Sequence, residues 1–149
     1  MTITQQVNED VKTAMRAKEP LKVGTLRMLK AAFITQEGKQ PKPLTESEAI
    51  AVIRTEIKKR QDSIVSFTTG GRTDLADKEL DEILVLKSYL PPELSQDELN
   101  KIVIDSIFET GALTQKDMGR VMKVATAKAN NAVDGKTLSQ LIQKLLNKC

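Results

Sequence analysis

The sequence contains no histidine, no tryptophan and one cysteine, and these shortages exclude several kinds of functional site. Without histidine, a Ser-His or Cys-His nucleophile cannot be assembled, and the commonest general base and metal ligand are missing. Because Cys149 is the single cysteine, the chain cannot form an internal disulfide framework, and we expect no cysteine-based metal site. We therefore predict a protein with no metal, no cofactor and no catalytic residues.

Long apolar segments and aromatic side chains are also scarce. No apolar run approaches the length needed to cross a bilayer, so we expect no membrane association. The first residues, MTITQQVNEDVK, lack the basic and apolar regions of a secretory signal. Aromatic residues make up only 3% of the chain, so the core must be aliphatic. Together with the shortage of cysteine, these features predict a cytoplasmic protein.

The net charge of +3 is distributed unevenly along the chain. Residues 1–72 carry 13 Lys/Arg and 8 Asp/Glu, residues 73–115 carry 3 and 10, and residues 116–149 carry 7 and 2. Two basic ends therefore flank an acidic middle segment. This pattern is compatible with a polyanionic partner, although solvated helix faces produce similar charge patches.

Apolar residues recur at helical spacing along nearly the whole chain, which predicts an all-α protein. Thr45-Glu-Ser-Glu48 and Ser95-Gln-Asp-Glu98 have the pattern of capping boxes that open helices. Pro91-Pro92 ends the fourth expected helix and marks the best domain boundary. We predict a helical N-terminal domain of about four helices and a small three-helix tail domain, over residues 1–92 and 93–149.

The stretch around Gly70-Gly71-Arg72 could be a phosphate-binding loop or a joint between helices. A phosphate loop needs a Walker spacing with a lysine, or a strand before the glycines, and neither is present. Gly70 is expected to end one helix as a left-handed C-cap, and Thr73 or Asp74 to cap the next helix. We predict a structural joint in which Arg72 pairs with the carboxylates that follow.

Basic side chains of the tail form the first candidate binding site. Three of them are spaced four and three residues apart, so they share one helix face, and two more lie nearby in sequence. They could track phosphates or form a solvated face opposite apolar residues. The five candidate phosphate contacts are Lys116, Arg120, Lys123, Lys128 and Lys136.

Two weaker candidates lie in the N-terminal part. Lys58 and Lys59 could contact phosphate, but ion pairs with Glu56, Asp62 or the fourth helix are the simpler expectation for this basic run. Glu79 and Glu82 could be read as paired carboxylates for acid–base work. A solvated or salt-bridged face is the simpler expectation for them too, since no metal motif accompanies them.

Three long segments resemble one family, the YqeY family, also called GatB/YqeY domain proteins. They are LRMLKAAF at 26–33, KKRQDSIVSFTTGGRTDLADKELDEILVLKSYLP at 58–91, and GALTQKDMGRVMK at 111–123. The family is similar to the helical and tail portion of the B subunit of the tRNA-dependent aspartyl/glutamyl amidotransferase. The resemblance covers nearly the full length. It implies a helical domain followed by a three-helix tail.

The resemblance also implies a function in the context of tRNA. In the amidotransferase the tail portion helps to hold tRNA, so the implied partners are tRNA or a tRNA-charging or amidotransferase enzyme. The family label of carbon–nitrogen ligase with glutamine as amido-N-donor belongs to the whole amidotransferase. A protein–protein adaptor is the alternative function. One departure from the family pattern is the turn Asn131–Lys136, where Ala132 replaces a basic residue.

Overall fold

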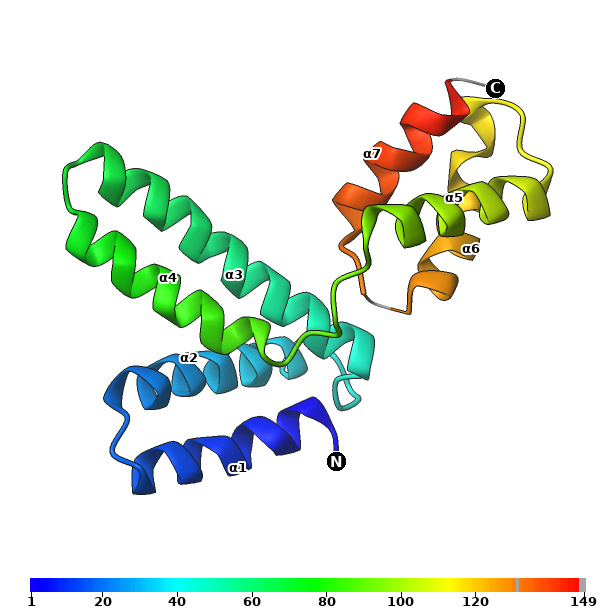
Figure 1. The fold of residues 1–149 in the computed structure, drawn as a ribbon. Helices are drawn as coiled ribbons and strands as arrows, with labels where there is room; N and C mark the ends of the chain where they lie inside the picture. Colours follow the sequence, from blue (N-terminus) through cyan, green and yellow to red (C-terminus); the bar gives the residue numbers. More distant parts are fainter. Residues whose placement is uncertain (131, 148–149) are drawn as a thin grey trace. The chain divides into compact units, whose positions relative to one another are not determined.

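A computed structural model describes residues 1–130 and 132–147, and every regular element in them is a helix (Figure 1). The all-α prediction is therefore confirmed. The predictions that involved Asn131 and Cys149 lie outside the described residues. The elements are α1 (Ile3–Arg16), α2 (Pro20–Glu37), α3 (Glu46–Thr69), α4 (Thr73–Lys87), α5 (Gln96–Thr110), the short 3-10 helix η1 (Gln115–Asp117), α6 (Met118–Ala129) and α7 (Gly135–Leu146).

The contacts between residues divide the chain into two compact units, Met1–Leu90 and Pro91–Cys149. The first unit, here the N-terminal unit, contains α1 to α4. The second, here the C-terminal unit, contains α5, η1, α6 and α7. None of the helices within the described ranges is long and apolar enough to cross a membrane.

Side-chain caps open several helices as the sequence indicates. The Thr45 hydroxyl accepts from the Glu48 N–H at 3.2 Å, and the Glu48 carboxylate accepts from the Thr45 N–H at 3.0 Å. The hydrogen bond from the Thr45 N–H, followed by the contact with the Thr45 hydroxyl, lowers the pKa of Glu48. The second expected box forms differently: the Ser95 hydroxyl accepts from the Glu98 N–H but donates to the Glu98 carboxylate. That carboxylate thus binds a hydroxyl instead of the expected backbone N–H.

The segment between α3 and α4 is a helix-to-helix joint, and its geometry corrects two expectations. Gly70 ends α3 with φ of −82°, and Gly71 is the residue in the left-handed conformation, with φ of +76°. Gly71 and Arg72 donate to the carbonyl oxygens of Thr68 and Phe67, as in a Schellman motif. Arg72, not Thr73 or Asp74, occupies the N-cap position of α4.

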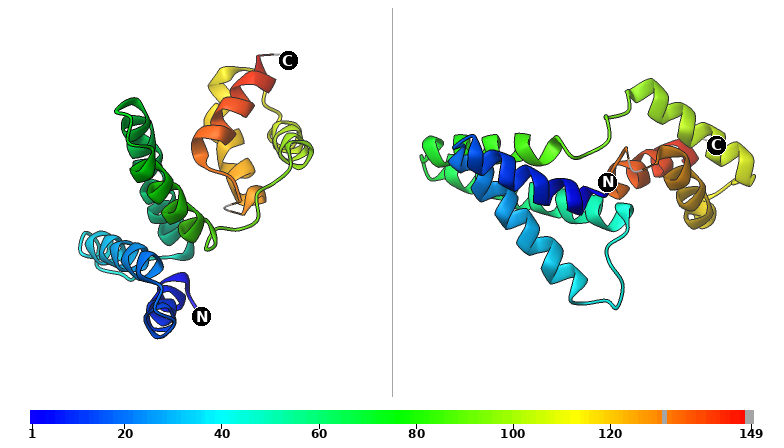
Figure 2. Two further views of the ribbon diagram at one scale, coloured as in Figure 1. Left: turned by 60° about the vertical axis from the view of Figure 1, so that its left-hand side comes forward. Right: turned by 90° about the horizontal axis from the view of Figure 1, so that it is seen from below.

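The predicted pairing of Arg72 with a following carboxylate is confirmed. Its guanidinium donates to both carboxylate oxygens of Asp74, at 3.2 and 3.1 Å. This contact lowers the pKa of Asp74. From the joint, α3 and α4 run side by side as an antiparallel hairpin, as the views of Figures 1 and 2 agree.

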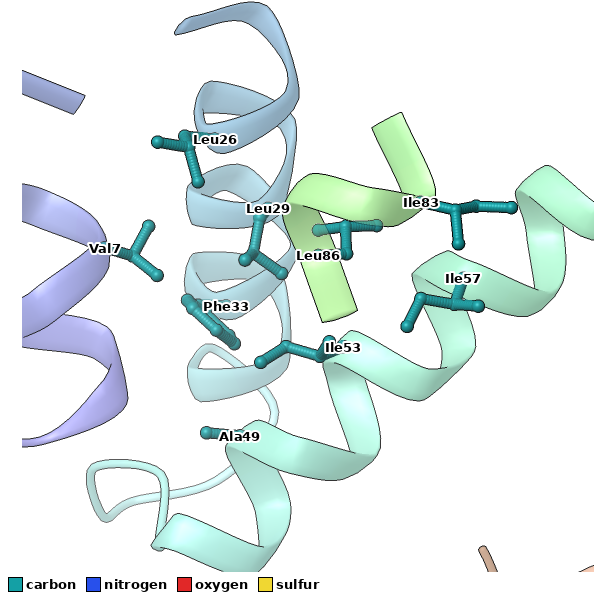
Figure 3. Packing of buried hydrophobic residues seen from close by; sticks show 9 residues of the cluster. All are labelled: Val7, Leu26, Leu29, Phe33, Ala49, Ile53, Ile57, Ile83 and Leu86. Carbon is teal, nitrogen blue, oxygen red and sulfur yellow. The ribbon is translucent and has the colours of Figure 1, made fainter. Parts of the chain in front are cut away.

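Hydrophobic side chains from all four helices, aliphatic except for Phe33, form the core of the N-terminal unit (Figure 3). On α2, Leu26, Leu29 and Phe33 are buried. On α1, Val7 and Ala14 are buried, whereas Met15 is half exposed. The core residues are Val7, Leu26, Leu29, Phe33, Ala49, Ile53, Ile57, Ile83 and Leu86.

A polar contact also joins the first and last helices of this unit. The half-buried Tyr89, just beyond α4, donates its hydroxyl to the Asp10 carboxylate of α1 at 2.5 Å. Burial, followed by this hydrogen bond, raises the pKa of Tyr89.

The C-terminal unit has a separate core, in which α5, α6 and α7 pack pairwise. Gly111 is the C-cap of α5 and is left-handed, with φ of +67°. Gln115 of η1 donates to the Gln143 carbonyl oxygen and to the Asn147 side chain, which ties η1 to the end of α7. The buried core residues are Leu99, Val103, Ala112, Val121, Ala125, Leu138, Ile142 and Leu146.

Candidate functional site

The five basic candidates of the tail are all exposed, but they do not all lie on one helix. Lys116 belongs to η1, whereas Arg120 and Lys123 belong to α6. Thr114 caps η1: its hydroxyl accepts from the Lys116 N–H at 3.3 Å. The expectation that Lys116, Arg120 and Lys123 share one continuous helical face is therefore wrong for Lys116, which lies on η1.

Asp117 anchors the beginning of α6. Its carboxylate accepts from the N–H groups of Leu113 at 2.9 Å and Thr114 at 3.2 Å, and it pairs with the Arg120 guanidinium. The hydrogen bond from Leu113 and the contact with Arg120 lower the pKa of Asp117 to about 2. Arg120 is thus oriented by a carboxylate that stays ionised at neutral pH.

Lys128 also has a partner within the unit. Its ammonium lies 3.0 Å from the Glu109 carboxylate, so this ion pair joins the last turn of α6 to the end of α5. For Lys116, Lys123 and Lys136, no carboxylate of residues 1–130 or 132–147 lies within ion-pair distance. Three of the five candidates can therefore meet an anion without first giving up an ion pair to a described carboxylate.

The two basic candidates of the N-terminal unit lie on α3. Lys59 is 3.3 Å from the Glu56 carboxylate, which confirms the expected local ion pairing. Lys58 is exposed, with no ion pair to a described carboxylate. These lysines belong to a different unit from the five tail candidates, so the structure gives no single surface for all seven.

Arg60 forms a buried charged cluster with α4 that the sequence only partly indicated. One guanidinium nitrogen, Nη1, donates to the Glu56 carbonyl oxygen at 3.0 Å, and Nη2 lies 3.6 Å from the Glu82 carboxylate. Nη2 also contacts the Met28 sulfur at 3.6 Å, while the buried Nε has no hydrogen-bond partner in the described structure.

This cluster includes one of the two acidic residues singled out on α4. Glu82 is buried and salt-bridged, as one of the two expectations had it, instead of solvated. Burial and the neighbouring Glu82 raise the pKa of Glu79. Arg60 binds Glu82 of α4 and the backbone of α3, so it joins both helices of the hairpin. This arrangement supports a structural role for the Arg60–Glu82 ion pair.

A groove of about 600 Å³ lies between α2 and α3 of the N-terminal unit. Small side chains such as Ala31, Ala32 and Ala51 line it, and Glu56 and Lys59 also contribute to its wall. Among the described residues, no group of three or more His, Cys, Asp or Glu could hold a metal ion.

Three exposed apolar side chains of the C-terminal unit were missed by sequence reasoning. Phe108 is 89% exposed, Leu113 is 76% exposed, and Ile104 is also exposed. Ile104 and Phe108 are four residues apart, so they share a stripe of α5 next to the buried stripe of Leu99 and Val103. The four-residue spacing of Ile104 and Phe108, which falls outside the core stripe, is the sequence signal that could have revealed this exposed apolar surface.

Fold and site together define a two-unit, all-helical protein with an exposed set of cations and apolar side chains on its three-helix unit. A comparison with family models agrees with this class: residues 4–146 match the family described as Yqey-like protein. The chain belongs to the YqeY family, and the resemblance noted from the three sequence segments is confirmed.

Several curated relatives are fungal proteins named "Altered inheritance of mitochondria protein 41, mitochondrial". The one from Pyrenophora tritici-repentis is 31% identical over 97% of this chain and 81% of its own length. Those from Kluyveromyces lactis and Lachancea thermotolerans are each 33% identical, over 66% and 69% of this chain. The chain covers little more than half of these two relatives, 55% and 57%.

The names of these relatives contradict the prediction of a cytoplasmic location. That prediction depended largely on the scarcity of cysteine, which argues against a disulfide framework. Scarce cysteine does not distinguish one reducing compartment from another, so the inference was too narrow, and we withdraw it.

Proposed function

We propose that this protein is a non-catalytic binding protein that holds tRNA through the basic side chains of its C-terminal unit. The observation that carries the proposal is the set of exposed cations on η1, α6 and α7. In this set Lys116, Lys123 and Lys136 have no described carboxylate partner. Membership of the YqeY family supports tRNA as the polyanion, through the likeness to the amidotransferase tail.

The ion-paired members of the set are compatible with this role. The side chains of Lys128 and Glu109 are both exposed, and exposed ion pairs typically contribute only about 0–1 kcal/mol. A phosphate group can therefore replace Glu109 as the partner of Lys128 at little cost, and the exposed Arg120 guanidinium has further donors for a phosphate while it pairs with Asp117. Each phosphate contact would release a counterion and make the affinity depend on salt.

The test is fluorescence anisotropy of the full chain against labelled tRNA over a range of salt concentrations. We expect log affinity to fall linearly with log salt. Changing both Lys116 and Lys123 to Ala should reduce the magnitude of the slope by about two units, roughly one per lost contact. Lys30→Ala, which removes an exposed lysine of α2, is the matched control. A folded wild-type protein without salt-sensitive affinity for tRNA would refute the proposal.

A protein–protein adaptor for a tRNA-charging enzyme is the second candidate function. The observation in its favour is on α4, where Leu80 and Leu84 are exposed one turn apart beside Asp77 and Asp81. Such a stripe is typical of protein interfaces. Retention of one defined protein after nuclease treatment, lost on changing Leu80 and Leu84 to Ser, would favour it over tRNA binding.

The ligase label of the amidotransferase is not part of the proposal. Ligase activity of this chain would be supported only if the purified protein showed glutaminase activity and lost it when one carboxylate was changed. Glu79 is the carboxylate to change first, because its pKa is raised by burial.

A further inference from the structure

Phe108 is the one aromatic ring of the described chain that is largely in water. The chain has four aromatic residues: Phe33 is buried, and Phe67 and Tyr89 are half-buried, whereas Phe108 is 89% exposed. A phenylalanine ring on a helix surface gains nothing from packing within its own unit. Its position must therefore be explained by something other than the core.

Two cations of α6 are held by residues that flank the exposed apolar side chains in the sequence. Glu109, which follows Phe108 in α5, forms the ion pair with Lys128. Leu113 donates its N–H to the Asp117 carboxylate, which in turn pairs with Arg120. Lys128 is thus held at the end of α5, and Arg120 is held at the loop that follows it.

A cation next to an exposed aromatic ring is the combination that binds an unpaired nucleotide. The cation takes the phosphate, and the ring stacks on the base, a contact open to every base because each has a π-face. A duplex keeps its bases stacked inside, so it can use the cations but not the ring.

We propose that Phe108 is a stacking platform for an unpaired base, so that the C-terminal unit binds RNA at a loop or a single-stranded end. This inference rests on the proposed RNA-binding function and adds the kind of RNA element that is recognised. Lys128, paired with the neighbouring residue Glu109, and Arg120, paired at the loop after α5, would supply the phosphate contacts.

Two acidic residues of α5, Asp105 and Glu109, lie close to Phe108 in the sequence and provide a further test. Asp105 is exposed on α5 one turn before Phe108, and the Glu109 carboxylate is compensated by Lys128 at 3.0 Å. If a phosphate takes over Lys128, the Glu109 charge becomes unfavourable. We therefore expect Glu109→Gln to raise RNA affinity several-fold and to increase the magnitude of the salt slope, because it frees Lys128 and removes a repelling charge.

The experiment measures the affinity of the full chain for an unpaired oligoribonucleotide and for an RNA duplex of the same strand length, both labelled. Phe108→Ala and Phe108→Leu are compared with wild type, and Ile104→Ala serves as a matched control for loss of an exposed apolar side chain. We expect both Phe108 variants to lose about 5- to 150-fold in affinity for the unpaired strand. Their affinity for the duplex and their salt slopes should stay unchanged.

Three results would overturn the inference, and they can be told apart. Salt-dependent RNA binding that neither Phe108 variant changes would leave the proposed function intact and exclude stacking. Absence of RNA binding by wild type would remove both. A protein partner lost with Phe108→Ala but kept with Phe108→Leu, with RNA affinity unaffected, would assign the patch to a protein interface. Because Phe108 is exposed, unchanged thermal unfolding of both variants should exclude misfolding as the cause.

Discussion

At the scale of single residues, Arg60 shows how a buried charge can hold a helical hairpin together. Its guanidinium contacts Glu82 of α4 and the backbone of α3, and the residue is only 5% exposed. Removing one partner of such a pair leaves an uncompensated buried charge, which typically costs about 3–5 kcal/mol. We expect Arg60→Met to destabilise the N-terminal unit by an amount of this order in urea unfolding.

The double variant Arg60→Met with Glu82→Leu is the informative control. Replacing both charges by apolar side chains of similar size is often neutral or stabilising. The double variant should therefore recover much of the lost stability. If it is as unstable as the sum of both single changes, the two side chains do not interact as the 3.6 Å separation indicates.

Asp117 predicts a pH dependence of the C-terminal unit. Its folded-state pKa is lowered from 3.8 to about 2, mainly by the hydrogen bond from Leu113. A carboxyl with a lowered folded-state pKa stabilises the fold above its unfolded value and loses that stabilisation as pH falls toward the folded value. We expect the stability of this unit to decrease from about pH 4 down to pH 2.

The titration of the Asp117 carboxyl carbon, followed by nuclear magnetic resonance, checks this expectation directly. Asp117→Asn should abolish the part of the acid destabilisation that belongs to this residue. A midpoint close to the ordinary value of 3.8 would show that the bonds from Leu113 and Thr114 do not hold the carboxylate in solution.

At the scale of elements, replacing glycine by alanine is expected to change the stability of the protein in opposite directions at two positions. Gly24 lies inside α2, and no heavy atom lies within 4 Å of the place where a Cβ would stand. Gly24→Ala should stabilise the protein by roughly 0.5–1 kcal/mol, because glycine loses more backbone freedom on folding. Gly71 has φ of +76°, so Gly71→Ala should destabilise by about 1–2 kcal/mol.

Gly70→Ala is the control for the joint, since Gly70 has an ordinary φ of −82°. It should cost less than Gly71→Ala in thermal unfolding of matched variants. Equal losses at both positions would show that the strain is not confined to the left-handed residue.

Local signals explain why most elements could be predicted from the sequence. Thr45 begins α3 and Gly111 ends α5 through hydrogen bonds to residues a few positions away. Such local bonds can be recognised from the spacing of residues in the sequence. Whether Gly70 or Gly71 takes the left-handed conformation depends on a one-residue difference in where α3 ends. Helix boundaries are uncertain by that much, so the sequence could not decide it.

The candidate site was less predictable, because it depends on which faces are covered by other helices. Spacing alone placed Lys116 on one helix with Arg120, but the turn at Asp117 is 3-10. The exposure of Phe108 depends on how α6 and α7 pack against α5, which periodicity does not report. The partners of Lys128 and Arg60 likewise lie on other helices and appear only in three dimensions.

At the scale of the whole molecule, the chain builds two separate hydrophobic cores, one in each unit. Leu29 is buried in the first and Ile142 in the second. Truncating a buried Leu or Ile to Ala typically costs about 2–5 kcal/mol through lost burial and the cavity left behind. Because no residue of one core belongs to the other, we expect each loss to remain within its own unit.

Amide hydrogen exchange of the full chain, read peptide by peptide, separates the two units without cutting them apart. Leu29→Ala should reduce protection of residues 1–90 and leave the buried amides of α5 to α7 unchanged, and Ile142→Ala should do the reverse. Independent unfolding would let the C-terminal unit keep the proposed RNA-binding surface while the N-terminal unit opens. If either substitution lowers protection evenly along the chain, the two units unfold as one cooperative block, and the proposed binding surface would depend on the N-terminal core as well.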